Sequence, residues 1–278
     1  MRLYLGLIAS ALFFVCAVTF FYPLIVVGAT SLGAPDGTLT AANYIEVVGS
    51  HYYLRALVET SMFCVATSAV AVAWALPLAW RMGRDLRGAR LLRGISQLNF
   101  AFAGILYGML MIALMGNAGA LTIIEARIFG TEHSAGLVYT TFGLALTYLS
   151  FQIPRAALII AEAVAKLDPS LLKAARTLGA RGLDVALLVS LPLIRPAIID
   201  AFAFSFVLSM GSFGPALLIA RSVTIYPAVV YREFTGFLNF GVAAAMALLL
   251  ALIVIVANLA ARALAGKTGR TLPEPRVI

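Results

Sequence analysis

The chain has 278 residues, of which 62% are hydrophobic and 12% are charged, and its formal net charge is +8. Soluble domains contain roughly 45–50% apolar and about 25% charged residues, so this composition excludes an ordinary soluble domain and indicates an integral membrane protein. At about 20 residues per crossing, the length suits six transmembrane helices with their loops, which predicts an all-α fold and one transmembrane domain over residues 1–278.

Six apolar runs mark the predicted transmembrane helices in chain order. Their approximate ranges are 3–27, 56–80, 95–115, 137–160, 197–220 and 241–264. The first run is about 25 residues long, which exceeds the roughly 7–15-residue hydrophobic region of a secretory signal, and no clear small-residue cleavage site comes after it. We therefore expect this run to be the first membrane helix.

Basic residues are distributed unevenly between the two sides of the predicted bundle. If the N-terminus is cytoplasmic, Arg55, Arg127, Arg221 and Arg232 fall on the outer side, and the other 16 of the 20 Lys and Arg residues fall on the inner side. Cytoplasmic loops of membrane proteins carry an excess of Lys and Arg. The distribution predicts that both termini and the loop 161–196 are cytoplasmic, and it explains the positive charge without nucleic-acid binding.

Polar residues inside the second and third runs are candidates for a solute pathway. Glu59 opens the second run, and an acid in a membrane segment is a functional candidate, although at a helix end it can also reach headgroups or water. Asn99 and Tyr107 are the polar residues of the third run that could face a pore. Gly104 and Gly108 have the small-xxx-small spacing that lets helices approach closely, so we expect them to pack.

The fifth run is the least regular, because Ser209-Met-Gly-Ser-Phe-Gly-Pro215 places two glycines and a proline inside an apolar segment. Irregular backbone at membrane depth is tolerated only where protein buries it or where it lines a water-filled cavity. Residues 211–215, and in particular Gly211, Ser212 and Phe213, are therefore pathway candidates. A simple helix kink is the alternative interpretation.

A short amphipathic helix is predicted in the loop 161–196. Asp168 is a good N-cap, Pro169 suits the first helical position, and Gly179 stands where a glycine would end the helix. One face carries Leu171, Ala174, Ala175 and Leu178, and the opposite face carries Lys173, Arg176 and Thr177. A helix of about ten residues spans about 15 Å, which is too short to cross a bilayer. It is typical of a docking element.

The chain carries no convincing catalytic or nucleotide-binding motif. Gly266-Lys267-Thr268 resembles the end of a phosphate-binding loop, but Ala261 occupies the position where that loop needs a glycine. Cys16 and Cys64 lie in separate predicted spans. We therefore predict a protein that is not an enzyme, that binds no metal and no cofactor, and that depends on another polypeptide if ATP energises transport.

The loop also resembles the cytoplasmic EAA loop of binding-protein-dependent ABC importer permeases. The matching residues are Lys173-Ala174-Ala175, Gly179 and then Val189-Ser190-Leu191-Pro192, and the segment 168–171 resembles the family's lead-in. The family pattern begins with a glutamate, so Lys173 reverses a charge. The resemblance implies that this helix couples the permease to an ATPase. The implied coupling residues are Asp168, Leu171, Lys173, Ala174, Ala175, Leu178, Gly179, Leu191 and Pro192.

The resemblance further implies a multi-pass permease subunit in a bacterial inner membrane, which moves a small polar solute by alternating access. The implied partners are an extracytoplasmic solute-binding protein, a second permease subunit of the same or a homologous kind, and cytoplasmic ATPase subunits that bind ATP and Mg. The segment around Ser212 and residues 231–250 look most like spermidine/putrescine-type permeases, so a polyamine is expected. Thiamine, phosphonate, iron and sulfate are the alternative solutes that the resemblance implies.

An ion-coupled secondary transporter or channel is the alternative class. Such proteins place charged or polar groups near the bilayer midplane and often contain inverted repeats. The predicted spans show few such charges and no clear repeat, which disfavours this class.

Overall fold

A computed structural model of the chain describes residues 2–33, 38–102, 104–220 and 224–269. Within those ranges the structure is almost entirely helical, and its β pairing is an isolated bridge between Gly33 and Leu39. Six helical stretches are long and apolar enough to cross a membrane, which confirms the predicted fold class. Arg221, which was assigned to the outer side, lies outside the described residues.

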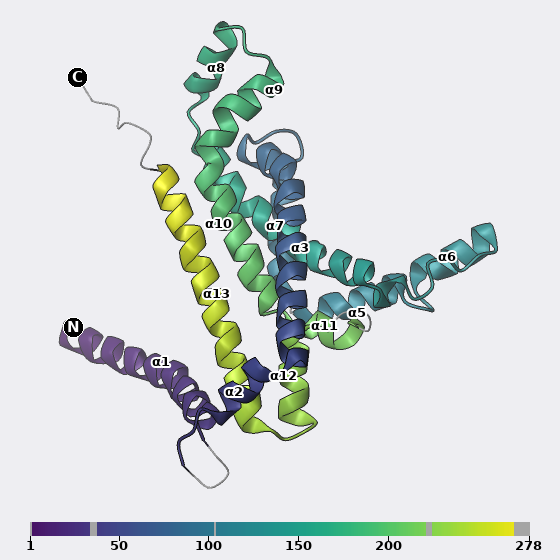
Figure 1. The fold of residues 1–278 in the computed structure, drawn as a ribbon. Coiled ribbons are helices and arrows are strands. Elements are labelled where there is room, and N and C mark those ends of the chain that lie inside the picture. The colour runs from purple at the N-terminus through teal and green to yellow at the C-terminus, as the bar shows by residue number, and fades with distance from the viewer. Residues whose placement is uncertain (1, 34–37, 103, 221–223, 270–278) are drawn as a thin grey trace. The chain divides into compact units, whose positions relative to one another are not determined.

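The helices succeed one another along the chain with short connections (Figure 1). They are α1 (Arg2–Ser31), α2 (Ala42–Gly49), α3 (His51–Gly83), α4 (Ala89–Leu98), α5 (Gly104–Met115), α6 (Ala120–Phe129), α7 (Thr141–Ala165), α8 (Pro169–Thr177), α9 (Gly182–Asp184), α10 (Leu191–Met210), α11 (Phe213–Ile219), α12 (Tyr226–Thr235) and α13 (Phe240–Gly269). Short 3-10 turns cover Asn99–Ala101 and Leu137–Tyr139, and a π-helical segment covers Val185–Ser190.

The third predicted span differs most from the structure. The expected helix 95–115 is interrupted between α4 and α5, and the apolar stretch runs instead from Gly104 to Phe129 through α5 and α6. Arg127, which the sequence placed in a loop, therefore lies on α6. The charge of Glu125 on the same helix is satisfied by the backbone amides of His133 (2.9 Å) and Ser134 (2.8 Å), a pairing that hydropathy does not reveal.

The fifth predicted span, 197–220, also has different boundaries. Helix α10 begins earlier, at Leu191, directly after the π-helical residues Val185–Ser190, and Pro192 lies in its first turn. It ends at Met210, and the chain resumes as α11 at Phe213. The interruption falls at Gly211 and Ser212, where the sequence predicted weakened helix.

The described residues form two compact units. The first combines residues 1–57 with 226–252, and its core consists of Val47, Ala56, Tyr226, Val229, Val242, Ala245 and Met246. Burial raises the pKa of the Tyr226 hydroxyl group to about 12, so this side chain stays neutral at physiological pH.

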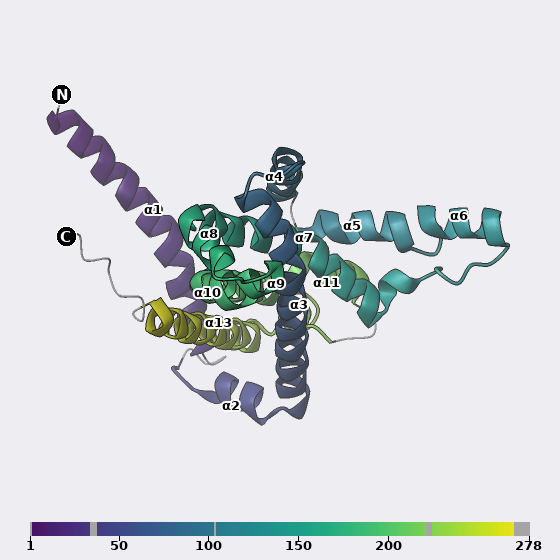
Figure 2. The same ribbon diagram turned by 90° about the horizontal axis from the view of Figure 1, so that it is seen from above.

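The second unit combines residues 58–225 with 253–278 and contains both the short loop helix and the irregular segment of the fifth span. Helices α3, α7 and α10 share its main core, in which small side chains recur, for example Ala79, Ala157 and Ala201. Small residues let membrane helices pack at short distances. Helices α5 and α6 of this unit extend to one side as an arm, which both ribbon views show (Figures 1 and 2).

Helices α5 and α11 also pack closely through glycine. A Cβ atom added at Gly108 would lie 3.2 Å from Pro215 Cα, and one added at Gly104 would lie 3.6 Å from Pro215 Cδ. The expectation that this glycine pair serves helix packing is confirmed. A Cβ atom at Gly214 would lie 2.7 Å from the backbone nitrogen of Ile105, so α11 contacts the start of α5 through bare backbone.

We predict that Gly214→Ala destabilises the protein by about 1–3 kcal/mol, because the added methyl group would overlap the Ile105 backbone and force the two helices apart. The measurement is the melting temperature of the purified protein in detergent. Gly211→Ala is the matched control, since its added methyl group would meet nothing closer than 3.6 Å. Equal melting temperatures for the two variants would contradict the close packing of α5 and α11.

Candidate functional site

The loop between α7 and α10 contains the predicted short helix, α8. The side chain of Asp168 accepts a 2.8 Å hydrogen bond from the Ser170 amide, and Pro169 occupies the first helical position. Gly179 has φ = +88°, and the Ala180 amide donates to the Ala175 carbonyl oxygen at 3.1 Å, which closes the helix. Hydrogen bonds from Ser170 lower the pKa of the Asp168 carboxyl group, so the cap is ionised at neutral pH.

The apolar residues of α8 differ in their exposure. Leu178 is 89% exposed, Leu171 is 47% exposed, and Ala174 and Lys173 are also exposed. Ala175 instead shares a partly buried side with Leu172. The predicted face omitted Leu172, although its spacing of three from Ala175 places the two on one helix face. Leu171, Ala174 and Leu178 form an exposed apolar surface, which we call the outward face of α8.

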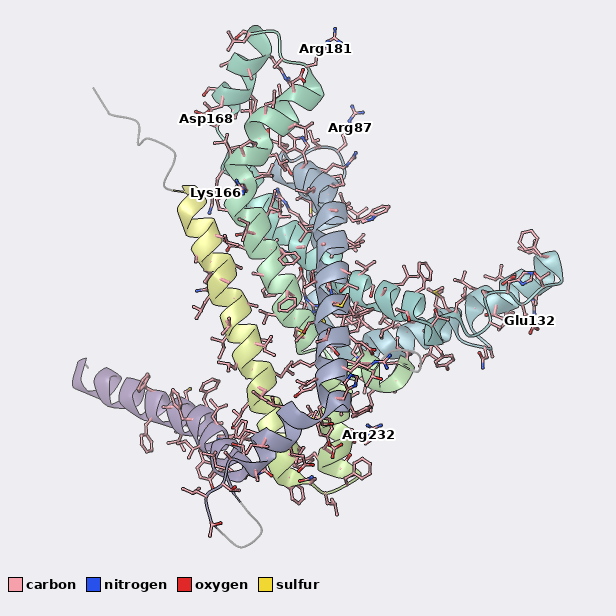
Figure 3. All side chains as sticks on the ribbon, viewed as in Figure 1. Arg87, Glu132, Lys166, Asp168, Arg181 and Arg232 are labelled. Atoms are coloured by element: carbon pink, nitrogen blue, oxygen red, sulfur yellow. The ribbon has the colours of Figure 1, made fainter. Side chains whose placement is uncertain are left out.

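The joint between α7 and α8 is held by the end of α3. Arg84 Nη1 donates a 3.2 Å hydrogen bond to the Leu167 carbonyl oxygen, one residue before the Asp168 cap. A Cβ atom at Gly83 would lie 2.6 Å from Val164 Cβ, so α3 and α7 are in close contact at this point. Figure 3 shows Lys166, Asp168 and Arg181 around the loop beyond the joint.

The loop returns to the membrane segment through α9 and the π-helical residues Val185–Ser190. The Ser190 hydroxyl group donates to the Val185 carbonyl oxygen at 3.1 Å, which gives the wide turn a side-chain hydrogen bond. Single π turns are rare and often occur at functional sites. The predicted coupling residues Leu191 and Pro192 come directly after it, in the first turn of α10, and both are exposed.

A second feature is a cavity of about 300 Å³ beside the interruption between α10 and α11. Its lining comes from the start of α5, the middle of α7, the end of α10 and the start of α11, and it includes the predicted residues Gly211, Ser212 and Phe213. The Tyr148 hydroxyl group donates a 2.6 Å hydrogen bond to the Ser212 carbonyl oxygen, so the interrupted backbone is anchored to α7.

Asn99 and Tyr107 lie next to this cavity rather than in its lining. The Tyr107 hydroxyl group donates to the Asn99 carbonyl oxygen at 2.8 Å, and the Tyr107 ring packs 5.5 Å from that of Phe151, which lines the cavity. Glu59 is partly buried on α3 and does not line the cavity. Pathway roles for these residues stay predictions.

Arg155 is a cavity residue that was not among the predicted pathway residues. The distribution of basic residues places Arg155 on the inner side, but α7 continues to Ala165, and Arg155 lies inside the apolar stretch Thr141–Ala165. Its guanidinium group lies 5.0 Å from the centre of the Phe100 ring and donates to the Asn99 carbonyl oxygen at 3.2 Å. A charged residue inside an apolar span was the available signal.

A buried polar cluster connects α3, α7 and α10. Gln152 Nε2 donates to the hydroxyl oxygens of Thr67 (3.4 Å) and Ser209, and all three side chains are buried. The amide nitrogen of Gln152 therefore finds its partners inside the bundle, whereas its buried Oε1 atom has no hydrogen-bond partner among the described residues.

Six apolar helices and the absence of a strand in the described residues define a helical membrane protein. The chain belongs to the family described as "Binding-protein-dependent transport system inner membrane component", which matches residues 71–270. It is a multi-pass membrane permease subunit of the ABC importer class.

Three relatives cover most of the chain. A probable molybdenum ABC transporter permease of Haloferax volcanii is 27% identical over 84% of this chain and 80% of its own length. A sulfate transport system permease of Salmonella typhimurium is 27% identical over 78% of this chain and 74% of its own length. A putative 2-aminoethylphosphonate transport system permease of the same organism is 25% identical over 84% and 83%.

Solved structures share the fold at low sequence identity. The crystal structure of a bacterial ABC transporter involved in the import of the acidic polysaccharide alginate gives a TM-score of 0.76 at 16% identity, covering 96% of this chain and 95% of that chain. A bacterial alginate ABC transporter in complex with an alginate pentasaccharide-bound periplasmic protein gives a TM-score of 0.73, covering 94% of this chain and 92% of that chain. At this identity the likeness supports the fold alone.

We predict that Asp168→Ala speeds amide hydrogen exchange in the first turn of α8, because the Ser170 amide loses its acceptor. Asp168→Asn should preserve most of the protection, since an asparagine side chain also caps a helix. The measurement is exchange mass spectrometry of a peptide covering residues 168–179. Because the pKa of Asp168 is lowered, protection in the native chain should stay constant down to about pH 5. Loss of protection between pH 7 and 5, or no change in Asp168→Ala, would contradict the cap.

Proposed function

We propose that α8 is the element through which cytoplasmic ATPase subunits drive this permease. The observation that carries the proposal is the outward face of α8, an exposed apolar surface on a helix that is capped at both ends and held at its base by Arg84. Exposed apolar surface on a short rigid helix is typical of a docking element. The chain's own family is binding-protein-dependent, which supports delivery of the solute by an extracytoplasmic binding protein.

The proposed mechanism is alternating access, with no covalent chemistry in this chain. ATP-driven closure of the ATPase pair moves α8, and the joint at Leu167 passes the movement to α3 and α7 together. A ligand can shift such an equilibrium only by binding its two states differently. The binding protein and the ATPase therefore each favour one of the two states. A second permease subunit, identical or homologous, completes the path, and both termini are proposed to be cytoplasmic.

The solute is proposed to be a small anion. The names of the relatives support this class, because they include sulfate and 2-aminoethylphosphonate, and a third names molybdenum. The polyamine expected from the segment around Ser212 is the second candidate, and none of these relatives' names points to it. Nothing in these comparisons favours an ion-coupled secondary transporter.

We predict that Leu171→Asp with Leu178→Asp uncouples the permease. Burying a carboxylate in an apolar contact is strongly unfavourable, so binding of the ATPase should fall by at least about tenfold. The measurement is ATP hydrolysis stimulated by the solute-loaded binding protein, in a complex reconstituted in nanodiscs. Arg87→Ser is the matched control, because Arg87 is also exposed but belongs to the connection before α4 (Figure 3). Full stimulation in the double variant would overturn the coupling proposal.

Lys173 generates a separate prediction about the ATPase surface. It is exposed next to the outward face and stands where the related pattern has an acid, so the receiving groove should offer it an acidic partner. Lys173→Glu should then weaken assembly at low ionic strength, by up to about fivefold, as expected for an exposed ion pair. Lys173→Met should have a smaller effect, and 1 M salt should remove the difference between the two variants. Tighter assembly of Lys173→Glu would contradict an acidic groove.

A further inference from the structure

The cavity beside the α10–α11 interruption carries a single ionisable side chain. Its lining is otherwise backbone, apolar side chains and the hydroxyl group of Ser212, and the charge comes from Arg155 alone. At about 300 Å³ it lies at the small end of ligand pockets, which suits a solute of a few atoms with some of its water.

Arg155 has no acidic partner in the described part of the chain. A guanidinium group has five N–H donors. Two of them are used, toward the carbonyl oxygens of Phe151 (3.4 Å) and Asn99 (3.2 Å). An ion pair between Arg93 and Asp85 lies outside this cavity. Arg155 therefore has no counter-charge and three N–H donors without a partner among the described residues.

The position of the guanidinium group is fixed from two sides. Aromatic rings of Phe100 and Phe151 lie 5.0 Å and 5.7 Å from its central carbon, and the two carbonyl oxygens hold its remaining edge. Such an arrangement orients the planar group and lowers the conformational entropy that ligand binding would cost. An unpaired charge inside an apolar span is costly to maintain, which points to function rather than packing.

We propose that Arg155 and the cavity form a transient binding station for an oxyanion on the solute pathway. Arg155 supplies the charge, and the hydroxyl group of Ser212 turns from the Leu208 carbonyl oxygen, to which it now donates at 2.6 Å, to contact the passing anion. A cationic solute would meet an uncompensated positive charge in a low-dielectric site, so the station disfavours polyamines. This inference rests on the proposed function and assigns a residue to its solute selectivity.

The first test measures the sign of the charge in the cavity and does not require transport. Ser212→Cys is introduced into a chain whose Cys16 and Cys64 are replaced by Ala, and the thiol is treated with two methanethiosulfonate reagents, one anionic and one cationic. Relative to their rates with free cysteine, the anionic reagent should react several-fold faster than the cationic one. Arg155→Met should abolish this preference, and Arg155→Lys should keep most of it. Equal preferences in native and Arg155→Met backgrounds would overturn the assignment.

Transport by the complete complex provides the second test. Complexes with the ATPase and binding protein are placed in liposomes, and uptake of sulfate, molybdate, 2-aminoethylphosphonate and putrescine is measured beside ATP hydrolysis. Arg155→Met should lower anion uptake at least about tenfold. ATP hydrolysis stimulated by the loaded binding protein should persist, and Arg155→Lys should restore part of the uptake. If Arg155 only stabilised the backbone, its replacement would instead lower the melting temperature, the uptake and the ATP hydrolysis together.

The outcomes separate the two proposals. Uptake of putrescine by the native complex, or native anion uptake by Arg155→Met, would overturn the oxyanion station while leaving the importer intact. A native complex without any binding-protein-stimulated ATP hydrolysis would overturn the proposed function, and the thiol measurement would still report the sign of the cavity. Arg87→Met is the control for loss of an arginine elsewhere, and it should leave uptake and reagent preference unchanged.

Discussion

A backbone carbonyl group in a membrane core must find a donor, and much of the second unit depends on that constraint. The helical backbone is interrupted near Asn99 and again at Gly211 and Ser212. Tyr107 and Arg155 donate to the Asn99 carbonyl oxygen, and Tyr148 donates to that of Ser212. Each donor comes from α5 or α7. These helices therefore fix the backbone conformation at both interruptions. The cavity lies beside the interruption at Gly211 and Ser212.

The same constraint explains why the cavity is polar at its edge and apolar elsewhere. Once the carbonyl groups are satisfied by side chains, the lining can be glycine and aromatic rings without stranded backbone groups. The glycines also allow α5 and α11 to touch through backbone. Arg155 takes part in both arrangements, because it donates to the Asn99 carbonyl oxygen and also lines the cavity. One side chain thus serves the structure and the proposed anion selectivity.

Features encoded locally could be predicted from the sequence. The α8 helix was predicted with both caps, because Asp168, Pro169 and Gly179 act on residues within a few positions of themselves. Composition was enough for six apolar helices. Long-range pairing could not be predicted. Glu125 is satisfied by amides beyond the end of α6, so hydropathy alone places it in a loop. Arg155 lies inside the predicted fourth span, but the carbonyl oxygen that it contacts belongs to a turn more than fifty positions away.

The joint at Leu167 has a consequence for which changes the loop can tolerate. Only Lys166, Leu167 and Asp168 connect α7 to α8, and Arg84 fixes the middle one to α3. Each residue added to a helix rotates the next segment of chain by about 100°. The direction of the outward face therefore depends on the length of this three-residue connection, in addition to the Asp168 cap that begins α8. One extra residue in the connection would turn Leu171 and Leu178 away from the surface that they contact.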